Sequence, residues 1–542
     1  MAEPKENLQM EKIVSLCKRR GFIFQSSEIY GGINGFWDYG PLGAELKRNV
    51  KELWWHTMTR QRDDVAGLEA TIIMHPKIWE ASGHVATFSD PMIDCKTCKR
   101  RFRADQTDEI PCPQKPSKMV SECHGEKTEA RPFNLMFKSH YGPLESDENV
   151  CYLRPETAQA IFAQFKNVLE TSRQKVPFGI GQIGKAFRNE VTPRNYTFRS
   201  REFEQMELEF FIKPDEAIEA IHGSVTTVPE TGHPGEPQPN WGWQAWHQYW
   251  VEERVRFYEG IGLARETLGF HRQTPEELAH YARACVDILF KFPFSKKDEQ
   301  GNVAGDELEG IAARSDFDLS QHQRFSGKPM GVFDDELRAA WAKLPKEKQD
   351  DLWRRYYENR KKYLTKMAKP DETPEQIQKQ VTDDANGLAK GQYIPHVIEP
   401  SAGVDRLILA LIANAYSETT KTDDKGKSET IYVMKFHPRV APIKVGVLPL
   451  LKNKPDLVKK ALEVRDLLRP WMNVYYDDGG SIGKRYARQD EAGTPFCVTI
   501  DFDTLGEKPE LLDTVTIRYR DDGKQERLKI SELRDFLLSK IR

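Results

Sequence analysis

The chain has 542 residues, with 80 Lys and Arg against 83 Asp and Glu, which gives a net charge of −3. The protein as a whole is therefore not a polycation, and any nucleic-acid binding must depend on local basic patches. Its length predicts about three or four domains with an ample core, and its mean hydropathy of −0.65, without a long apolar run, argues against a membrane protein. The opening MAEPKENLQMEK lacks the apolar centre of a signal peptide, and eight cysteines are too few for a disulfide scaffold, so we expect a cytoplasmic protein.

Two helices are predicted near the N-terminus. Residues 11–20 form the first, which ends at Gly21. The second begins at Pro41, because the missing N–H of proline costs nothing in the first turn of a helix. Its apolar stripe has helical spacing and consists of Leu42, Leu46, Val50, Leu53 and Trp54. Such a stripe is typical of an ordinary core helix.

Four cysteines gather in an insertion at about residues 90–130. Cys95 and Cys98 form a CxxC pair, and Cys112 and Cys123 follow at wider spacing. Four thiolates can complete a tetrahedral zinc site, but the second half of this set is not a CxxC pair. The spacing leaves open a structural zinc site or four reduced thiols, and it favours either over a redox role.

The segment at residues 149–165 predicts a strand that runs into a helix. Pro155 would begin the helix and Glu156 would lie in its first turn, where a carboxylate complements the helix dipole. Residues 179–185, GIGQIGK, then match both GxGxxG and GxxxxGK. Ala186 stands where a P-loop requires Ser or Thr, and the residues after it alternate instead of forming a helix. This argues against a phosphate-binding loop here.

Residues 184–212 predict two strands joined by a polar loop. Pro193 fixes φ in that loop, and Asn195 tolerates a left-handed conformation. Alternation in the second strand places Met206, Leu208, Phe210 and Ile212 on a core face, and Phe203, Gln205, Glu207 and Glu209 on the other.

If these strands pair as an antiparallel hairpin, one surface collects charged and aromatic side chains around a cleft: Arg188, Glu190, Phe203 and Glu207. That set suits an anionic phosphate, a flat ring and an ammonium group. The alternative is a solvated hairpin with a charged face. A large aromatic residue between charges, flanked by Arg194, Arg199 and Arg201, is unusual for such a surface.

The chain from residue 223 to residue 390 alternates between insertions and predicted elements. A Pro- and Gly-rich loop at 223–242 precedes a helix at 243–258, and residues 278–294 predict a helix followed by an apolar strand. Glu307, Glu309 and Ile311 would share one face if their segment is extended. Such carboxylates could hold Mg²⁺ beside a nucleotide, although alone they are more often solvent-facing. A charged helical insertion spans residues 334–390.

Residues 392–416 predict a strand, a sharp turn and a buried helix. Ser401 would be the N-cap, Gly403 would allow close approach of a ligand, and Arg406 would lie near the first turn. After His437, strands alternate with helices over roughly 100 residues, which predicts a mainly parallel or mixed sheet. Ser531 would cap the last helix.

Five motifs occur in order along the chain: GPLGAELK, RPETAQ, FRNE…FRSREFEQME, ELEGIA and EPSAGVDR. Together they resemble the class II aminoacyl-tRNA synthetases, in the form found in glycyl-tRNA synthetases, over nearly the whole chain apart from the insertions. The resemblance implies an α+β catalytic domain over residues 1–435, with a six-stranded antiparallel sheet flanked by helices. It also implies an α/β anticodon-binding domain over residues 436–542 and a homodimer formed through the helix after Pro41.

The activity implied by the resemblance is ligation of glycine to tRNA(Gly) with ATP and Mg²⁺. The alternative is a synthetase-like paralogue that binds nucleotide without charging tRNA. ATP would be bound by Arg188, Asn189, Glu190, Phe198, Arg199, Phe203, Glu307, Leu308, Gly403 and Arg406. Glycine would be bound by Arg103, Glu156, Phe203, Gln205, Glu207, Arg314, Glu399, Ser401 and Gly403.

Within these sets the resemblance implies particular roles. Arg188 would meet the α-phosphate and Arg406 the γ-phosphate, as the catalytic pair. Phe203 would stack on adenine, Glu307 would be a magnesium ligand, and Arg314 would meet the glycine carboxylate. The stretch from Trp341 to Lys369 has ten Lys or Arg against four Asp or Glu, so we expect it to contact the tRNA backbone near the acceptor end.

Overall fold

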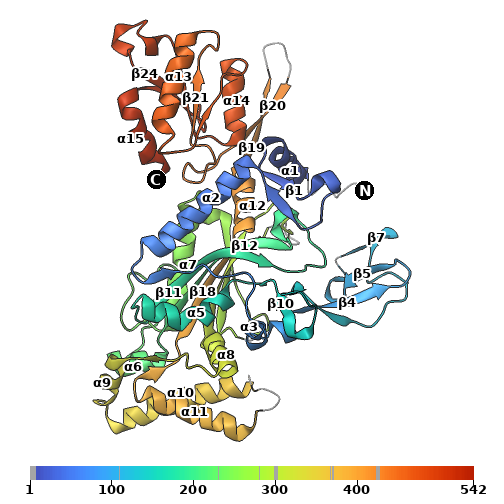
Figure 1. Ribbon diagram of the computed structural model, residues 1–542, viewed down its shortest axis with the longest axis vertical. Helices are drawn as coiled ribbons and strands as arrows, with labels where there is room; N and C mark the ends of the chain where they lie inside the picture. Colours follow the sequence, from blue (N-terminus) through green and yellow to red (C-terminus); the bar gives the residue numbers. More distant parts are fainter. Residues whose placement is uncertain are drawn as a thin grey trace.

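The computed structural model describes residues 8–108, 110–229, 231–279, 281–297, 303–366, 368, 372–422 and 428–542. The molecule is elongated (Figure 1), with the C-terminal domain at one end and a helical insertion at the other. A module that contains β4, β5 and β7 projects from one side. Within the described residues, each helix is too short or too polar to cross a membrane.

A seven-stranded sheet forms the centre of the molecule, in the order β13-β14-β15-β18-β12-β11-β3. The pairs from β13 to β11 are antiparallel, which confirms the expected six-stranded antiparallel core, and β3 adds a parallel edge to β11. The strands are β3 Val65–Gly67, β11 Phe178–Phe187, β12 Glu202–Ile212, β13 Leu268–Arg272, β14 Ala284–Phe290, β15 Asp306–Ser315 and β18 His396–Gly403.

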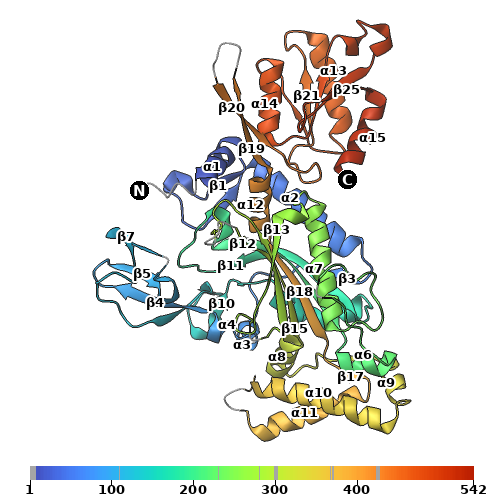
Figure 2. The same ribbon diagram turned by 180° about the vertical axis from the view of Figure 1, so that it is seen from behind.

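Helices cover both faces of this sheet (Figures 1 and 2). The helices that pack on its strands are α2 Pro41–Trp55, α5 Ala158–Thr171, α7 Trp243–Glu259 and α12 Val404–Ala415. The chain also contains α1 Leu8–Arg20, α3 Lys77–Ala81, α4 His84–Thr87, α6 Asp215–His222 and α8 Phe317–Ser326. Short two-stranded sheets join them: β1 Ile23–Gln25 with β2 Trp37–Tyr39, β9 Lys138–His140 with β10 Val150–Tyr152, β16 Val332–Phe333 with β17 Gln392–Tyr393, and β19 Tyr416–Thr422 with β20 Ser428–Met434.

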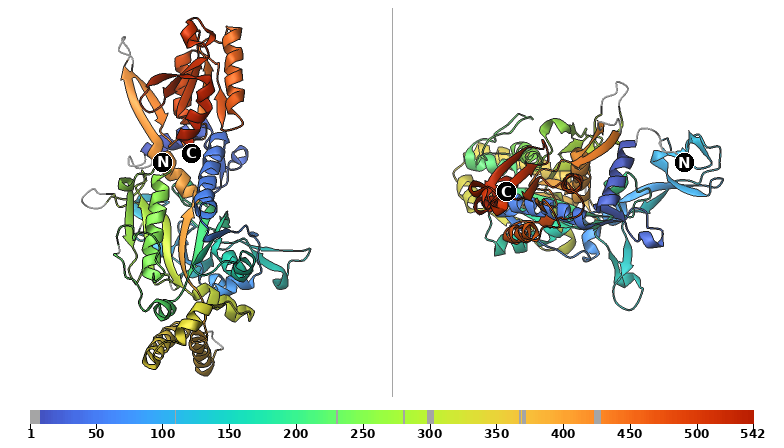
Figure 3. Two further views of the ribbon diagram at one scale, coloured as in Figure 1. Left: turned by 90° about the vertical axis from the view of Figure 1, so that its left-hand side faces the viewer. Right: turned by 90° about the horizontal axis from the view of Figure 1, so that it is seen from above.

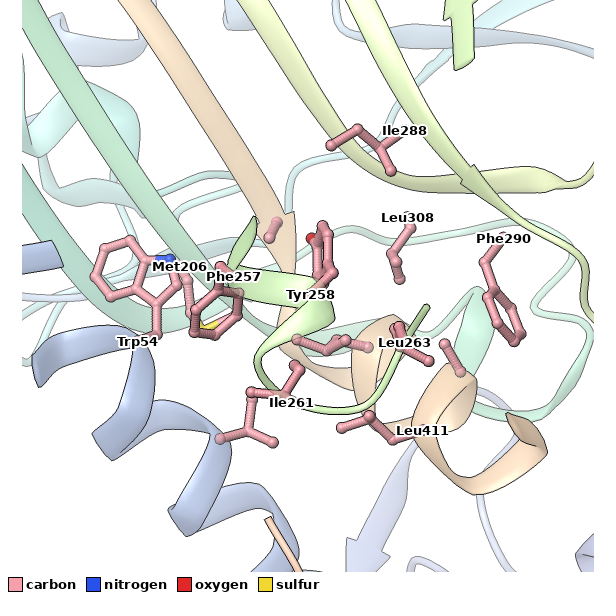
Figure 4. Close-up of a cluster of buried hydrophobic side chains, with 14 of the residues drawn as sticks. Trp54, Met206, Phe257, Tyr258, Ile261, Leu263, Ile288, Phe290, Leu308 and Leu411 are labelled. Carbon is pink, nitrogen blue, oxygen red and sulfur yellow. The ribbon is translucent and has the colours of Figure 1, made fainter. Parts of the chain in front are cut away.

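The hairpin of β11 and β12 has the faces that its alternation predicts. Met206, Leu208, Phe210 and Ile212 are fully buried. Met206 lies in the cluster of Figure 4, with Trp54 of α2 and with Phe257 and Tyr258 of α7. In the connecting loop, Asn195 has a φ of 58°, the left-handed conformation expected of it. The opposite face of β12 therefore points away from this core.

Two predicted helices differ from the structure. Helix α5 begins at Ala158, because the buried Arg154 donates to the carbonyl of Lys185 at 2.6 Å and keeps the chain extended past Pro155. Glu156 therefore precedes the helix. The helix predicted from Leu278 is absent in the described residues 278, 279 and 281–283, where the N–H of Arg283 instead bonds the carbonyl of Ala313 on β15 at 2.8 Å.

Two further predictions, on β15 and β18, are corrected. A bulge in β15 at Leu308 turns Glu307 and Glu309 to opposite faces, so Glu309 is buried against Arg254 while Glu307 is exposed. Strand β18 runs directly into α12 without a sharp turn. Its N-cap is Gly403, and Ser401 is a strand residue opposite Glu207.

The predicted helical insertion consists of α9 Asp335–Trp341, α10 Lys346–Lys366 and α11 Pro374–Leu388. Helices α10 and α11 lie side by side (Figures 1 and 2). The buried face of α10 consists of Leu352, Tyr356, Arg360 and Leu364. Met367 and Lys369, at the end of the basic stretch, lie outside the described residues.

The C-terminal domain lies at one end of the molecule (Figure 3, orange to red). It has its own core and a mixed sheet in the order β22-β21-β23-β24-β25. Its elements are β21 Val445–Pro449, α13 Pro455–Leu468, β22 Val474–Tyr476, α14 Ile482–Ala492, β23 Phe496–Ile500, β24 Thr514–Tyr519, β25 Gln525–Lys529 and α15 Ile530–Ile541. The mixed sheet is as predicted, but β25 was not. Helix α15 is preceded by Lys529 as N-cap, so Ser531 is not its cap.

Candidate active site

A cleft of about 190 Å³ lies over the ends of β11, β12, β15 and β18. Its lining contains the predicted nucleotide residues Arg188, Glu190, Phe198, Arg199, Phe203, Glu307, Leu308, Gly403 and Arg406, together with Gln205 and Ser401. Thr197, Ser200 and Asp405 also line it and were not predicted. We call the set Arg188, Arg199, Phe203, Glu307 and Arg406 the outer cleft.

A few contacts orient two arginines of the outer cleft. Arg188 Nε donates to the carbonyl of Pro155 at 3.0 Å, and its guanidinium lies 5.4 Å from the centre of the Phe203 ring. Arg406 donates to the carbonyl of Phe198 at 3.2 Å and pairs with Glu307 at 3.2 Å. These contacts leave most of the N–H groups of both guanidinium groups available.

Arg199 lies in the same cleft. Among the described residues, its guanidinium has no hydrogen-bond partner. Burial lowers its pKa, and the nearby cations Arg194 and Arg406 lower it further, against the opposing effect of Glu190. A concentration of arginines around an aromatic ring suits a polyanion that carries a flat base.

An ionic network connects the outer cleft to α2. Asp405, at the start of α12, accepts hydrogen bonds from Tyr39 at 2.6 Å, from Lys47 of α2 at 2.8 Å and from the N–H of Glu204 at 2.7 Å. Lys47 also pairs with Glu204 at 2.8 Å. The N-terminus of α12, and with it Arg406, is thereby fixed against β12.

Deeper than Gln205 and Ser401, strands β12, β15 and β18 and the segment before α5 bring together a second set. We call it the inner cluster: Glu156, Glu207, Glu209, Arg314 and Glu399. Glu207 accepts hydrogen bonds from Ser401 at 2.7 Å, from Gln205 at 2.9 Å and from Thr157. Burial raises the pKa of Glu207, as does the negative charge of Glu156.

Arg314 is the cation of the inner cluster. It forms two hydrogen bonds to Asp318, at 2.9 and 3.0 Å, and one to Glu399 at 2.6 Å. Burial nonetheless raises the pKa of Glu399 to about 8; Arg314 opposes this, while Glu207 and Glu156 reinforce it. Three of the five N–H groups of Arg314 are thus bound to protein carboxylates.

Glu156 and Glu209 differ in their partners. Burial raises the pKa of Glu156, but His84, at 3.3 Å, together with Arg314 and Gln159 holds it well below the usual range. Glu209 is fully buried, and neither of its oxygens has a hydrogen-bond partner in the described part of the chain. Burial raises its pKa well above the usual range. The cluster has more carboxylates than cations, which suits a small ammonium group.

The structure brings together most of the predicted residues, but not all. Asn189 follows Arg188, and its N–H bonds the carbonyl of Leu135 at 2.6 Å. Arg103 does not line the cleft: it lies in the insertion that carries the four cysteines, where it pairs with Asp90 at 2.9 Å and with Asp105 at 2.7 Å. Thr157, Asp318 and His84 were not predicted to take part. Thr157 lies within the RPETAQ motif and Asp318 lies four residues after Arg314, whereas no motif marks His84.

The cysteine module holds the predicted thiols close together. It consists of β4 Ser89–Cys95, β5 Arg100–Arg103, β6 Pro111–Cys112, β7 Lys115–Met119 and β8 Arg131–Asn134. Cys98 Sγ lies 3.6 Å from Cys112 Sγ and 3.8 Å from Cys123 Sγ, and the Sγ of Cys95 lies within 4.8 Å of those of Cys98 and Cys123. All four are free thiols.

Comparison with known proteins identifies the scaffold. Residues 140–231 match the model of the tRNA synthetase class II core domain (G, H, P, S and T), and residues 444–540 match the anticodon binding domain. The glycine–tRNA ligase of Treponema denticola is 43% identical over 97% of this chain and 96% of its own length. The chain belongs to the glycine–tRNA ligase family.

Other members of this glycine–tRNA ligase family are similar over comparable lengths. Those of Streptomyces coelicolor and Thermus thermophilus are each 40% identical over 98% of this chain, and 98% and 99% of their own lengths are matched. The family assignment accounts for the fold, with a class II core followed by an anticodon-binding domain. It confirms the family resemblance that the five sequence motifs indicate.

Proposed function

We propose that this protein ligates glycine to tRNA(Gly) at the expense of ATP. One observation carries the proposal: a cationic outer cleft opens onto a buried carboxylate cluster, in a chain whose full-length relatives are glycine–tRNA ligases. A nucleoside triphosphate fits the outer cleft, and an amino acid without a side chain fits the inner cluster. The reacting carboxylate and α-phosphate would meet between Arg188 and Gln205.

The chemistry has two steps. The glycine carboxylate attacks the α-phosphorus of ATP in line and releases pyrophosphate; the terminal hydroxyl of tRNA then attacks the carbonyl carbon of glycyl-adenylate and releases AMP. Neither step needs a nucleophile from the protein. Both need positioned reactants and neutralisation of developing negative charge.

The outer cleft would bind ATP. Arg188 would contact the α-phosphate and Arg406 the γ-phosphate, while Phe203 stacks on adenine and Arg199 lies beside the nucleotide. Glu307 is half exposed at the rim, where its carboxylate could hold Mg²⁺. That ion, when bound, would neutralise charge on the phosphates.

The inner cluster would bind the glycine ammonium through Glu156, Glu207 and Glu399, with Ser401 and Gln205 orienting Glu207. Arg314 keeps two N–H groups for the glycine carboxylate after its bonds to Asp318 and Glu399. Selection against alanine would come from steric exclusion of one methyl group, because attraction to a group of that size contributes only about 1–3 kcal/mol.

ATP–pyrophosphate exchange without tRNA tests this function directly. We expect exchange that depends on glycine and is weaker with alanine or serine. No exchange with glycine, or stronger exchange with alanine or serine, would refute the substrate assignment. Exchange without transfer of glycine to tRNA(Gly) would favour the alternative of a paralogue that does not charge tRNA.

We further propose that the four thiolates bind a structural zinc ion. Sulfurs at about 2.3 Å from a tetrahedral zinc lie about 3.8 Å apart, close to the separations around Cys98. The backbone N–H of Cys98 lowers the pKa of Cys95, and that of Gln114 lowers the pKa of Cys112, which favours thiolates at these two positions. Burial and the neighbouring thiols raise the pKa of Cys98 to about 12, so its proton would be lost to the metal. Metal analysis of untagged protein should give about one zinc per chain, and Cys98→Ser should lose it. Metal-free protein with full activity would indicate four reduced thiols.

We also propose that the chain forms a homodimer through α2. The support is the resemblance of GPLGAELK to the dimer-forming motif of the class. Sedimentation equilibrium should give twice the chain mass of 62.5 kDa. A monomer that retains full activity would refute this.

A further inference from the structure

A second cavity, of about 320 Å³, lies between the N-terminal end of β18, the C-terminal end of β15 and helix α10. It shares no lining residue with the outer cleft. The residues that surround it are Glu216, Tyr281, Ala282, Arg283, Ser315, Asp316, Tyr356, Asn359, Arg360, Lys362, Tyr363, Lys366 and His396. The proposed reaction uses none of them.

Two buried polar groups of this cavity lack hydrogen-bond partners within the described residues. His396, the first residue of β18, is 6% exposed and its Nδ1 is unpaired. The hydroxyl of Tyr363 on α10 is also buried and unpaired. An unpaired buried polar group costs about 1–3 kcal/mol, and both of these residues line the same cavity, so a ligand bound there that paired with them would offset this cost.

The charges around the cavity favour an anion. Four cations line it against two carboxylates. Arg360 is already bound to Asp316 and, at 2.9 Å, to Asp384. Arg283 and Lys362 are exposed at the rim, and neither forms an ion pair within the described residues.

The remaining carboxylate does not cancel this excess. Glu216 is 7% exposed and accepts a hydrogen bond from Asn359 at 2.8 Å. Burial raises its pKa, which reduces its negative charge. His396 is itself neutral at pH 7, because burial lowers its pKa to about 3, and Arg283 and Arg360 lower it while Asp316 opposes them. A neutral imidazole can donate one N–H.

We propose that this cavity binds a phosphate group. Arg283, Lys362, Tyr363 and His396 offer four kinds of donor from three separate segments, and a phosphate has enough oxygens to accept from all of them. The volume exceeds that of a phosphate alone, and the rings of Tyr281, Tyr356 and Tyr363 in the wall provide room for an attached organic part. The phosphate belongs either to a small phosphorylated molecule or to the tRNA backbone.

The cavity adjoins the inner cluster. The ring of Tyr281 lines the cavity, and the guanidinium of Arg314 lies 4.0 Å from its centre. Ser315, between Arg314 and the cavity residue Asp316, has a φ of 55°, which is unusual for a residue other than glycine. The phosphate would thus lie next to the proposed glycine pocket, on the side that the insertion covers.

Equilibrium binding of radiolabelled inorganic phosphate tests the proposal, with the outer cleft filled by a non-hydrolysable glycyl-adenylate analogue. We expect saturable binding to the unmodified protein and at least tenfold weaker binding to the double variant Arg283→Ala, Tyr363→Phe. The matched control is Lys346→Ala, which removes an exposed lysine of the same helix, paired with Asp350, outside the cavity; it should bind phosphate normally. Thermal unfolding confirms that the variants are folded.

No saturable binding with the outer cleft filled, or equal affinity in the double variant, would overturn the proposal. Competition with tRNA(Gly) separates the two sources of phosphate. Displacement of phosphate by tRNA would assign the site to the nucleic-acid backbone, and its absence would assign it to a small phosphorylated molecule. Because phosphate binding is measured directly, the result does not depend on whether the chain charges glycine.

Discussion

The outer cleft and the inner cluster hold charge in different ways. In the outer cleft, Arg188 and Arg406 are oriented by bonds to carbonyl oxygens and by aromatic rings, and Arg406 also pairs with Glu307. Arg199 is unpaired in the described structure. In the inner cluster, Glu207 accepts three side-chain hydrogen bonds and Arg314 donates three. Arginines with free N–H groups suit a large, flexible polyanion, whereas side chains that are bonded mainly to one another suit a small ligand of fixed shape.

This difference implies that substitutions in the two regions have different effects. Substitution in the outer cleft removes charge stabilisation where negative charge develops, so it should lower the rate of adenylate formation. Substitution in the inner cluster removes a contact to the amino acid and also leaves buried donors unpaired, so it should weaken glycine binding and destabilise the fold. The predictions below are ordered by their expected effect on glycine-dependent exchange.

Arg188→Ala should have the largest effect. We expect adenylate formation to fall about 10²–10³-fold, as for other donors that stabilise transition-state charge, with the fold intact. Lys185→Ala is the matched control, because Lys185 lies near the end of β11, just before Arg188, but is exposed and paired with Glu202. Stopped-flow or exchange kinetics measure the rates. Near-normal turnover in the Arg188 variant would remove this residue from the catalytic set.

Glu207→Gln should raise the KM for glycine about 10–100-fold, because a hydrogen bond to a charged group contributes about 1.5–3 kcal/mol. The KM for ATP should change little. Glutamine also places an amide donor against Thr157 and Ser401, so the melting temperature should fall. Glu202→Gln, at the partly exposed start of the same strand, is the control. Unchanged glycine KM in the Glu207 variant would place the ammonium elsewhere.

The glycine KM should also depend on pH. Since the pKa of Glu399 is raised to about 8, this carboxyl is protonated below that pH and must lose its proton to bind an ammonium group. The glycine KM should therefore fall as pH rises from 6.5 to 8.5, by at most about tenfold per pH unit for one proton, while the ATP KM stays level. A glycine KM independent of pH would show that Glu399 is already ionised.

Replacement of Arg354, Arg355, Lys361 and Lys362 on α10 with Ala should leave glycine-dependent exchange unchanged and weaken tRNA binding. Each lost phosphate contact should reduce the log–log salt slope by about 0.7–0.9. Arg354 pairs with Asp351 and Arg355 with Asp351 and Glu219, so Lys361 and Lys362 should contribute most. An unaltered KM for tRNA with an unaltered salt slope would show that α10 does not contact tRNA.

Local patterns in the sequence predicted much of the fold. Alternation in residues 202–212 gave both faces of β12, and proline at position 41 gave the start of α2. Contacts between distant residues account for the errors. Arg154 holds Glu156 outside α5 through the carbonyl of Lys185, and pairing with β14 forces the bulge that separates Glu307 from Glu309.

The outer cleft was predicted better than the inner cluster, because the inner cluster depends on contacts between distant residues. The residues of the outer cleft lie in three short motifs, and the structure brings those motifs to one cleft. The inner cluster depends on the pairing of Arg314 with Glu399, which is 85 residues away, and on His84, which no motif marks. Such partners follow from strand order, which local periodicity does not reveal.

Separate equilibrium binding of ATP and glycine to Arg406→Ala and Glu207→Gln tests the two-part cleft most directly. We expect Arg406→Ala to weaken ATP binding about tenfold or more, a loss of about 1.4 kcal/mol, and to leave glycine affinity unchanged. We expect Glu207→Gln to weaken glycine binding and to leave ATP affinity unchanged. If either variant weakened both ligands equally, the outer cleft and the inner cluster would be one binding unit, and the account would be wrong.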